Sequence, residues 1–350
     1  MNFASDNAAP VAPEILKAIA EANQGAALAY GNDLWTKRVE QKFAALFERD
    51  VAVFLVPTGT AANALAIAHL APPWGAVLCH AESHVMTDEC GAPEFFGGGL
   101  KLVGLTGEAG KIAPETLERA LCGRQWGGPH HVTPAVLSLS QATEAGTIYR
   151  LDEICNLAEI AHARGLAVHM DGARLANALA RMNASPPQAT WKAGVDVLSF
   201  GASKGGALAA EAIIFFDPAR GAGMSDRRKR GGHLISKHRF IAAQIEAYLC
   251  DGLWLRLARH ANAMGERLGQ KLAGLGFPPI WPVEANEVFV ALPADAIERL
   301  TAAGAGFYPW ATTGAPKRLA PNASLLRLVA SFATSAEEVD QFVETVANVL

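Results

Sequence analysis

The 350-residue sequence is short of cysteine, of charge and of long apolar runs, and each shortage excludes a class of protein. No two cysteines form a C-x-x-C pair, which argues against a zinc ribbon or a disulfide framework and favours a reducing compartment. No stretch reaches the roughly 18 apolar residues that a membrane helix needs. The N-terminus lacks the basic patch and apolar run of a signal peptide. We therefore expect a cytoplasmic protein with no metal site and no membrane partner. The five cysteines are Cys79, Cys90, Cys122, Cys155 and Cys250.

The charge of the chain gives no reason to expect a nucleic-acid partner. The formal net charge is −4, so phosphate backbones are not attracted in general. One stretch, residues 227–239 (R-R-K-R-G-G-H-L-I-S-K-H-R), is strongly basic. It lacks interleaved aromatic residues, so we interpret it as a solvated helix end rather than a nucleic-acid site.

The length and the apolar content predict two domains around buried parallel strands. Residues 1–50 are expected to form an N-terminal arm and helices, and residues 51–255 a large domain with alternating strands and helices. A proline-rich linker, F-P-P-I-W-P-V, leads into a small α+β domain within residues 256–350. In the small domain, strands are expected at 288–292, 307–310 and 325–330.

The stretch 166–206 carries the clearest chemistry. Two apolar runs with strand character, 166–170 and 195–200, are followed by Asp171 and Lys204. Because ligands of open α/β sheets bind beyond the carboxyl ends of the strands, both side chains are expected to face one crevice. A lysine that forms a Schiff base and an acid that holds a pyridine nitrogen protonated are what pyridoxal phosphate (PLP) requires. The glycines after Lys204 would leave room for a flat ring. Taken singly, each residue is an ordinary strand-end or loop residue.

A second signal is a strand, a turn and a helix in V-A-V-F-L-V-P-T-G-T-A-A-N. Thr58, Gly59 and Thr60 stand where the helix begins, and free N–H groups at the positive end of a helix bind phosphate. The alternative is an ordinary threonine N-cap.

These segments resemble the L-threonine aldolases, which belong to the aspartate-aminotransferase-like PLP enzymes of fold type I. The resemblance covers essentially the whole chain and rests on P-T-G-T-x-A-N, the histidine after the next strand, H-M-D-G-A-R, S-K-G and R-L-V. It implies an α/β fold of the PLP-dependent transferase type, with a mostly parallel central sheet in a large domain and a small C-terminal α+β domain. The strand expected at 209–217 would run antiparallel in this fold. The implied reaction cleaves L-threonine, L-allo-threonine and related β-hydroxy-α-amino acids to glycine and an aldehyde.

The resemblance also implies roles for individual residues. Lys204 would hold PLP, Asp171 would pair with its ring nitrogen and Arg174 would lie near its phenolate oxygen. His84 would stack on the ring, with Glu89 nearby, and His84 or His131 would be the base for the substrate hydroxyl. His130 replaces His131 if the register shifts by one. Three residues would bind substrate: Ser5, Tyr30 and Arg327. For Arg327 the alternative is an edge-strand arginine that faces solvent.

The chain departs from the family at two places. S-L-S-Q-A-T-E-A-G-T-I replaces E-N-T-H-N-G-G, so Gln141, Glu144 and Ala145 stand in for family residues near the substrate. G-G-H-L-I-S-K replaces a motif whose arginine reaches the cofactor phosphate of a neighbouring subunit, and Arg230 and Lys237 are the candidates for that charge. The resemblance further implies a homo-oligomer, a dimer of dimers with the active site at a subunit interface. Alternatives are an aminotransferase, a β-eliminating lyase or a non-catalytic PLP-binding protein.

Overall fold

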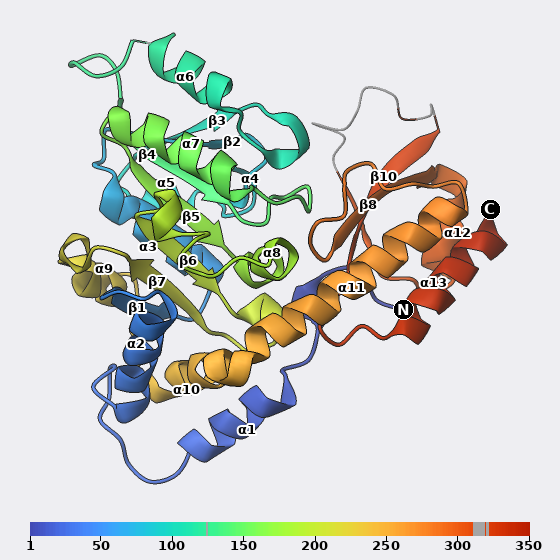
Figure 1. The fold of residues 1–350 in the computed structure, drawn as a ribbon, viewed down its shortest axis with the longest axis horizontal. Helices are drawn as coiled ribbons and strands as arrows, with labels where there is room; N and C mark the ends of the chain where they lie inside the picture. The colour runs from blue at the N-terminus through green and yellow to red at the C-terminus, as the bar shows by residue number, and fades with distance from the viewer. Residues whose placement is uncertain (124, 311–318, 320–321) are drawn as a thin grey trace.

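The computed structural model describes residues 1–123, 125–310, 319 and 322–350. A seven-stranded sheet with the order β1-β7-β6-β5-β4-β2-β3 forms the centre of the large domain (Figure 1). Five adjacent strands, β6, β5, β4, β2 and β3, run parallel to one another. β7 runs antiparallel to both β6 and β1, as expected for residues 209–217. The strands are β1 (Ala52–Val56), β2 (Gly75–His80), β3 (Lys101–Leu105), β4 (Thr133–Ser140), β5 (Ala167–Gly172), β6 (Val197–Gly201) and β7 (Glu211–Phe215).

The central strands are buried on both faces, which explains why they are apolar runs rather than alternating ones. On one face, Val197 and Ile213 pack with the alanine-rich helix α3 (Gly59–Leu70). On the other face, Leu198 and Ile214 belong to a larger core that includes, among others, residues of four helices. These are α2 (Leu34–Leu46), α7 (Leu151–Ala163), α8 (Leu175–Met182) and α10 (Arg239–Leu249).

A smaller three-stranded antiparallel sheet, β8-β10-β9, lies to one side of the large domain (Figure 1). Its strands are β8 (Glu287–Pro293), β9 (Tyr308–Pro309) and β10 (Ala323–Val329). The long helix α11 (Leu253–Gly274) runs from the large domain to this sheet, and α12 (Ala294–Ala302) and α13 (Ala336–Val349) pack beside it. The three strands therefore lie close to the ranges that the sequence predicts.

The first residues of the chain belong to the small domain. The Phe3 N–H donates to the Gly306 carbonyl at 2.8 Å, and the Val329 N–H donates to the Phe3 carbonyl at 2.8 Å. The Phe3 ring meets the edge of Phe342 with 5.0 Å between centroids. The chain then passes under the large domain as α1 (Pro13–Ala22), so the N-terminal arm joins the two domains.

The remaining helices are short and lie at the rim of the large sheet. They are α4 (His84–Thr87), α5 (Ala92–Phe96), α6 (Pro114–Cys122) and α9 (Met224–Arg230). α9 begins the basic segment, and all four residues of its last turn are basic, which suits the negative end of a helix dipole. Among the residues described, no helix combines the length and apolar character needed to cross a bilayer.

Candidate active site

Two adjoining cavities open at the carboxyl ends of β5 and β6. Both are lined by Gly59, Thr60, His84, Ala173 and Lys204. The inner one adds Asp171, Arg174, Asn63 and Glu144, and the outer one, of about 330 Å³, adds Thr58, Ser203, Leu208 and Glu211. The fold thus brings to one place seven residues that the sequence singles out for cofactor or catalysis: Thr58, Gly59, Thr60, His84, Asp171, Arg174 and Lys204.

Lys204 stands in a tight turn between β6 and β7. The Glu211 carboxylate accepts hydrogen bonds from the N–H of Ala202 (3.0 Å) and of Ser203 (3.3 Å), which clamps the backbone that leads into the lysine. Burial raises the pKa of Glu211 to about 7, although the hydrogen bonds from Ser203 and Ala202 act to lower it. Gly205, the residue after Lys204, is required by packing, because a side chain there would collide with Tyr248. The space beside it is taken by Tyr248 and not left for a flat cofactor ring.

Asp171 ends a chain of four hydrogen-bonded side chains. It lies within β5, where its carboxylate accepts from the Asn63 amide (2.9 Å) and from the Ala173 N–H (3.0 Å). The Asn63 amide also donates to Glu89 (2.8 Å), which pairs with His84 Nδ1 (2.9 Å). The bond to Glu89 raises the pKa of His84 although burial opposes it, and burial raises the pKa of Glu89. The imidazole is therefore held in one orientation in the cavity.

Arg174 is tied into a buried network that joins both domains. It donates to the two carboxylate oxygens of Asp6 at 2.8 and 3.1 Å and lies 3.3 Å from Glu287. Burial would lower the pKa of the guanidinium, but Asp6 and Glu287 raise it. Burial would likewise raise the pKa of Asp6, yet Arg174 and Lys204 hold it below its ordinary value. Sequence reasoning missed Glu287, which could have been recognised as a lone carboxylate in the apolar strand A-N-E-V-F-V, because a buried charge needs a partner.

The start of α3 combines an N-cap with a phosphate-binding arrangement. The Thr58 hydroxyl accepts from the Ala61 N–H at 3.1 Å, so this side chain caps the helix. No described residue accepts a hydrogen bond from the N–H of Gly59 or Thr60. A Cβ added at Gly59 would meet no atom within 4 Å, so space for a ligand adjoins these two donors.

Several predicted site residues lie outside the two cavities, and their roles stay predictions. His131 is exposed on a loop and bonds to Gln125. Tyr30 is 47% exposed, with Lys229 4.7 Å from its ring centroid. Ser5 caps a short helix by accepting from the Asn7 N–H. Three cationic residues complete the set: Arg230 and Lys237, both exposed, and Arg327.

Arg327 does not face solvent freely. Its guanidinium carbon lies 4.4 Å from the ring centroid of Trp310 and 5.7 Å from that of Tyr308. Its Nε is buried and has no hydrogen-bond partner within the described part of the chain. The side chain therefore retains a donor for an anionic group.

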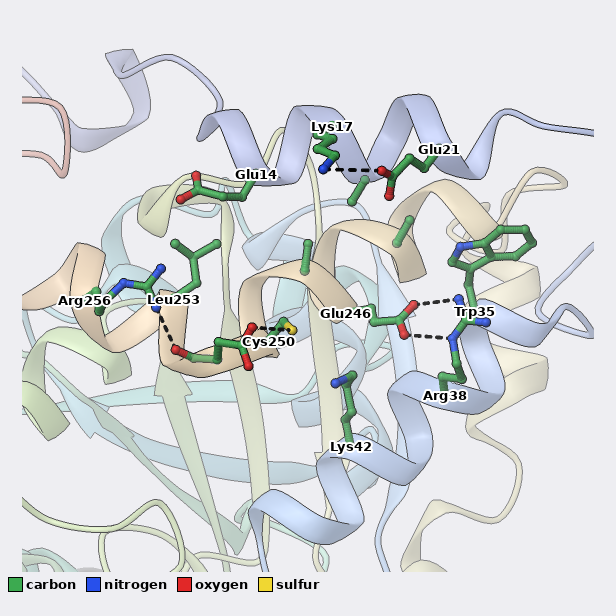
Figure 2. A pocket seen from close by; sticks show the side chains of 14 residues that line it. Glu14, Lys17, Glu21, Trp35, Arg38, Lys42, Glu246, Cys250, Leu253 and Arg256 are labelled. Carbon is green, nitrogen blue, oxygen red and sulfur yellow. Dashed lines mark hydrogen bonds and ion pairs between the residues drawn. The ribbon is translucent and has the colours of Figure 1, made fainter.

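A larger hollow of about 450 Å³ lies on the outer surface, between α1, α2 and α10 (Figure 2). Four of its charged side chains form ion pairs: Lys17 with Glu21 at 3.7 Å, and Arg38 with Glu246 at 2.7 Å. It therefore offers less reactive chemistry than the smaller cavities beside Lys204. In the residues that the structure describes, no three His, Cys, Asp or Glu side chains are grouped to hold a metal ion.

The donor set beside Lys204 fits PLP. The lysine amine suits the aldehyde of PLP, and the carboxylate in the same cavity suits its pyridine nitrogen. The imidazole suits the flat ring, and the helix N-terminus with free N–H groups suits the phosphate. Fold and site together define a PLP-dependent enzyme of fold type I.

Comparisons with known proteins identify the family. The β-eliminating lyase family matches residues 2–295. A low specificity L-threonine aldolase of Pseudomonas aeruginosa is 45% identical over 313 residues, which cover 89% of this chain and 90% of the relative. Its Saccharomyces cerevisiae counterpart is 25% identical and covers 83% and 73%. Leishmania major threonine aldolase has a TM-score of 0.91 at 29% identity and covers 100% of this chain and 99% of that one.

This chain belongs to the β-eliminating lyase family and, within it, to the low-specificity L-threonine aldolases. It is a PLP-dependent lyase. A serine palmitoyltransferase of Sphingomonas wittichii, with a TM-score of 0.73 at 17% identity, shares the fold. The predictions of fold type I, of PLP and of an aldolase-type lyase are confirmed.

Proposed function

We propose that this protein cleaves L-threonine, L-allo-threonine and related β-hydroxy-α-amino acids into glycine and an aldehyde by breaking the Cα–Cβ bond. The observation that carries the proposal is the cavity that Lys204, Asp171 and His84 share, in a chain 45% identical to an L-threonine aldolase over nine-tenths of that relative. PLP, when bound, supplies a ring that takes up the electron pair released at Cα.

The cofactor residues follow from the donors that line the cavity. Lys204 would hold PLP covalently, and Asp171 would keep the ring nitrogen protonated. The N–H groups of Gly59 and Thr60 would bind the phosphate at the positive end of α3. His84, fixed by Glu89, would lie against the ring.

The substrate residues are assigned with the family as a guide. Arg327 and Ser5 would bind the α-carboxylate, and the unpartnered Nε of Arg327 supports this role. A carboxylate held on one side decides which bond at Cα stands perpendicular to the ring. Tyr30 would contact substrate from a neighbouring subunit, and Arg230 or Lys237 would reach the cofactor phosphate there. His84 or His131 is the base that the sequence predicts for the hydroxyl.

A homo-oligomer, a dimer of dimers, is part of the proposal. Its support is an exposed face that joins three segments: the Tyr30 N–H donates to Ser236, Lys229 lies over the Tyr30 ring, and Phe96 of α5 lies 6.0 Å from His233. Large apolar side chains stand exposed in these segments, among them Leu28, Leu34 and Phe95. Contiguous exposed apolar surface is typical of a protein interface. All five cysteines are free, which suits the proposed cytoplasmic location.

The test is an assay of the PLP-loaded protein with L-threonine, L-allo-threonine and L-phenylserine, without a 2-oxo acid. We expect glycine and aldehyde in equal amounts from the wild type. Lys204→Ala should lose the visible absorbance of the bound cofactor and lower the rate by several orders of magnitude. A lysine-dependent absorbance without aldehyde would contradict the aldolase reaction, and a requirement for a 2-oxo acid would point to amino-group transfer.

A further inference from the structure

Glu144 is a carboxylate in the cofactor cavity to which no role has been assigned. It follows β4 and lines the inner cavity together with Lys204, His84 and Asp171. Its position is one at which this chain departs from the family pattern. The mechanism described above leaves it unused, although its charge lies within the field of Lys204 and His84.

The loop that carries Glu144 is built to hold it still. The Gln141 side chain exchanges two hydrogen bonds with the Tyr149 backbone, at 2.8 and 2.9 Å. The Thr147 hydroxyl donates to the Ala109 carbonyl at 2.7 Å and accepts from the Thr143 hydroxyl at 2.8 Å. These side chains are buried. A loop with such internal bonding places its one charged side chain with little freedom, as catalysis requires.

The carboxylate of Glu144 stands directly beside the candidate base His84. Glu144 Oε1 accepts a hydrogen bond from the backbone N–H of His84 at 3.3 Å, at the start of α4. Within the described chain, the side chain makes no second hydrogen bond, so Oε2 remains an acceptor. Burial raises the pKa of Glu144, and the charges of Lys204 and His84 oppose the rise. A carboxylate with a raised pKa accepts a proton more readily than one in water.

His84 is less suited to accept a proton. Its Nδ1 is committed to Glu89, and this bond raises the pKa of the imidazole. At a given pH, a larger fraction of the rings therefore already carries both protons and has no nitrogen left to accept another. His131 is exposed on a loop and lines neither cavity in the described chain. Of the acid–base groups in the cavity, Glu144 is the carboxylate with a free oxygen.

We propose that Glu144 is the catalytic base that takes the proton of the substrate's β-hydroxyl. The O–H bond breaks and its proton passes to Glu144 as the hydroxyl carbon becomes an aldehyde carbonyl and the Cα–Cβ bond breaks. The electron pair of that bond goes to Cα. Cα then gains a proton, which balances the one that Glu144 received, and glycine forms. The role rests on the proposed aldolase function.

The test compares two reactions of the PLP-loaded enzyme. One is retro-aldol cleavage of L-threonine, followed by aldehyde release, and the other is exchange of the glycine α-hydrogen in deuterium oxide, followed by NMR. Glycine has no β-hydroxyl, so its exchange does not need this base. We expect Glu144→Gln to lower the cleavage rate by roughly 10²- to 10⁴-fold and to leave the exchange rate, the cofactor absorbance and the PLP dissociation constant close to those of the wild type.

The matched control is Glu82→Gln, the same change two residues before His84 at a partly buried glutamate that lines neither cavity. It should leave both rates unchanged. Cleavage at the wild-type rate by Glu144→Gln would overturn the proposal, and so would an equal fall in both reactions, which would make Glu144 a structural residue. If the wild type itself released no aldehyde, the aldolase function would fail instead, independently of the variant.

Discussion

Charged residues occur both in the cavity beside β5 and β6 and on the exposed face formed by Tyr30, segment 227–239 and α5. In the cavity, Asp171, Glu211 and Arg174 are each held by hydrogen bonds or ion pairs, as Arg174 is by Asp6 and Glu287. On the exposed face, Lys229 rests on the Tyr30 ring, and Phe95 is 80% exposed. The difference teaches that one copy of the chain fixes Asp171, Arg174 and Glu211 with its own partners, whereas the outer face leaves large apolar side chains exposed.

The largest effect is expected from breaking the buried network. Arg174→Met leaves the Asp6 and Glu287 carboxylates buried without their cation, which typically costs about 3–5 kcal/mol. Urea unfolding of the apoprotein would measure this loss. Arg299→Met, which removes an exposed pair with Asp295 on α12, should change the free energy of unfolding by about 0.5 kcal/mol or less. Equal losses in the free energy of unfolding for the two variants would contradict this expected difference between a buried and an exposed ion pair.

A smaller, pH-dependent effect is expected at Glu211. Its pKa is raised to about 7 in the folded protein, from about 4.5 when unfolded, so ionisation opposes folding. The protonated carboxyl therefore stabilises the folded protein by on the order of 3 kcal/mol below pH 4.5, relative to the ionised one. This contribution to the free energy of unfolding is lost as pH rises through 7.

Glu211→Gln removes this titration. The free energy of unfolding of the wild type minus that of the variant, measured by urea unfolding, should therefore decrease as pH rises from 5 to 8. A difference that stays constant with pH would show that the carboxyl titrates normally.

The exposed face is tested by a charge at its most exposed aromatic residue. If Phe95 is buried against a second copy, Phe95→Glu loses about 1.5–3 kcal/mol of association free energy, which corresponds to a dissociation constant raised about 10- to 100-fold. Analytical ultracentrifugation would measure it. Leu350→Glu, at the exposed C-terminus, should leave the oligomer intact. If the wild-type protein were monomeric, the proposed homo-oligomer would be wrong.

The smallest effect is expected at His131. Since its side chain is exposed and bonds to Gln125 on the same loop, His131→Asn should change stability by less than about 0.5 kcal/mol. If Glu144 is the base, the cleavage rate should fall much less than it does for Glu144→Gln. A loss as large as that of Glu144→Gln would restore His131 as the base and place its loop at the site.

The parts of the site that the sequence predicts are those with a local signal. Asp171 and Lys204 follow apolar strands, and Gly59 and Thr60 begin a helix, so a window of about ten residues suffices to place each at the carboxyl edge of the sheet. The positions of the three small-domain strands along the chain and the antiparallel direction of β7 were predicted as well. Asp171 itself lies inside β5 because it continues the pairing with Ser199 on β6.

The parts that sequence reasoning missed depend on contacts between distant segments. Asp6 and Arg174 are 168 residues apart, and Asn286 reaches Asp6 across 280 residues. Glu211 was part of a predicted strand, and Glu144 was only a departure from a motif. Neither has a local pattern that announces a clamp or a free carboxylate, since both roles arise from the backbone groups and charges that face them.

By itself, the sequence determined the α/β class and predicted that Lys204 and Asp171 face one crevice, because apolar periodicity and strand-end residues are properties of a short stretch of chain. Only the tertiary structure decided that Asp6, Arg174 and Glu287 form one buried network and that Glu144 stands beside His84. The physical reason is that a carboxylate or guanidinium has no fixed role of its own. Its pKa and its available atoms depend on the burial and the partners that the folded chain provides.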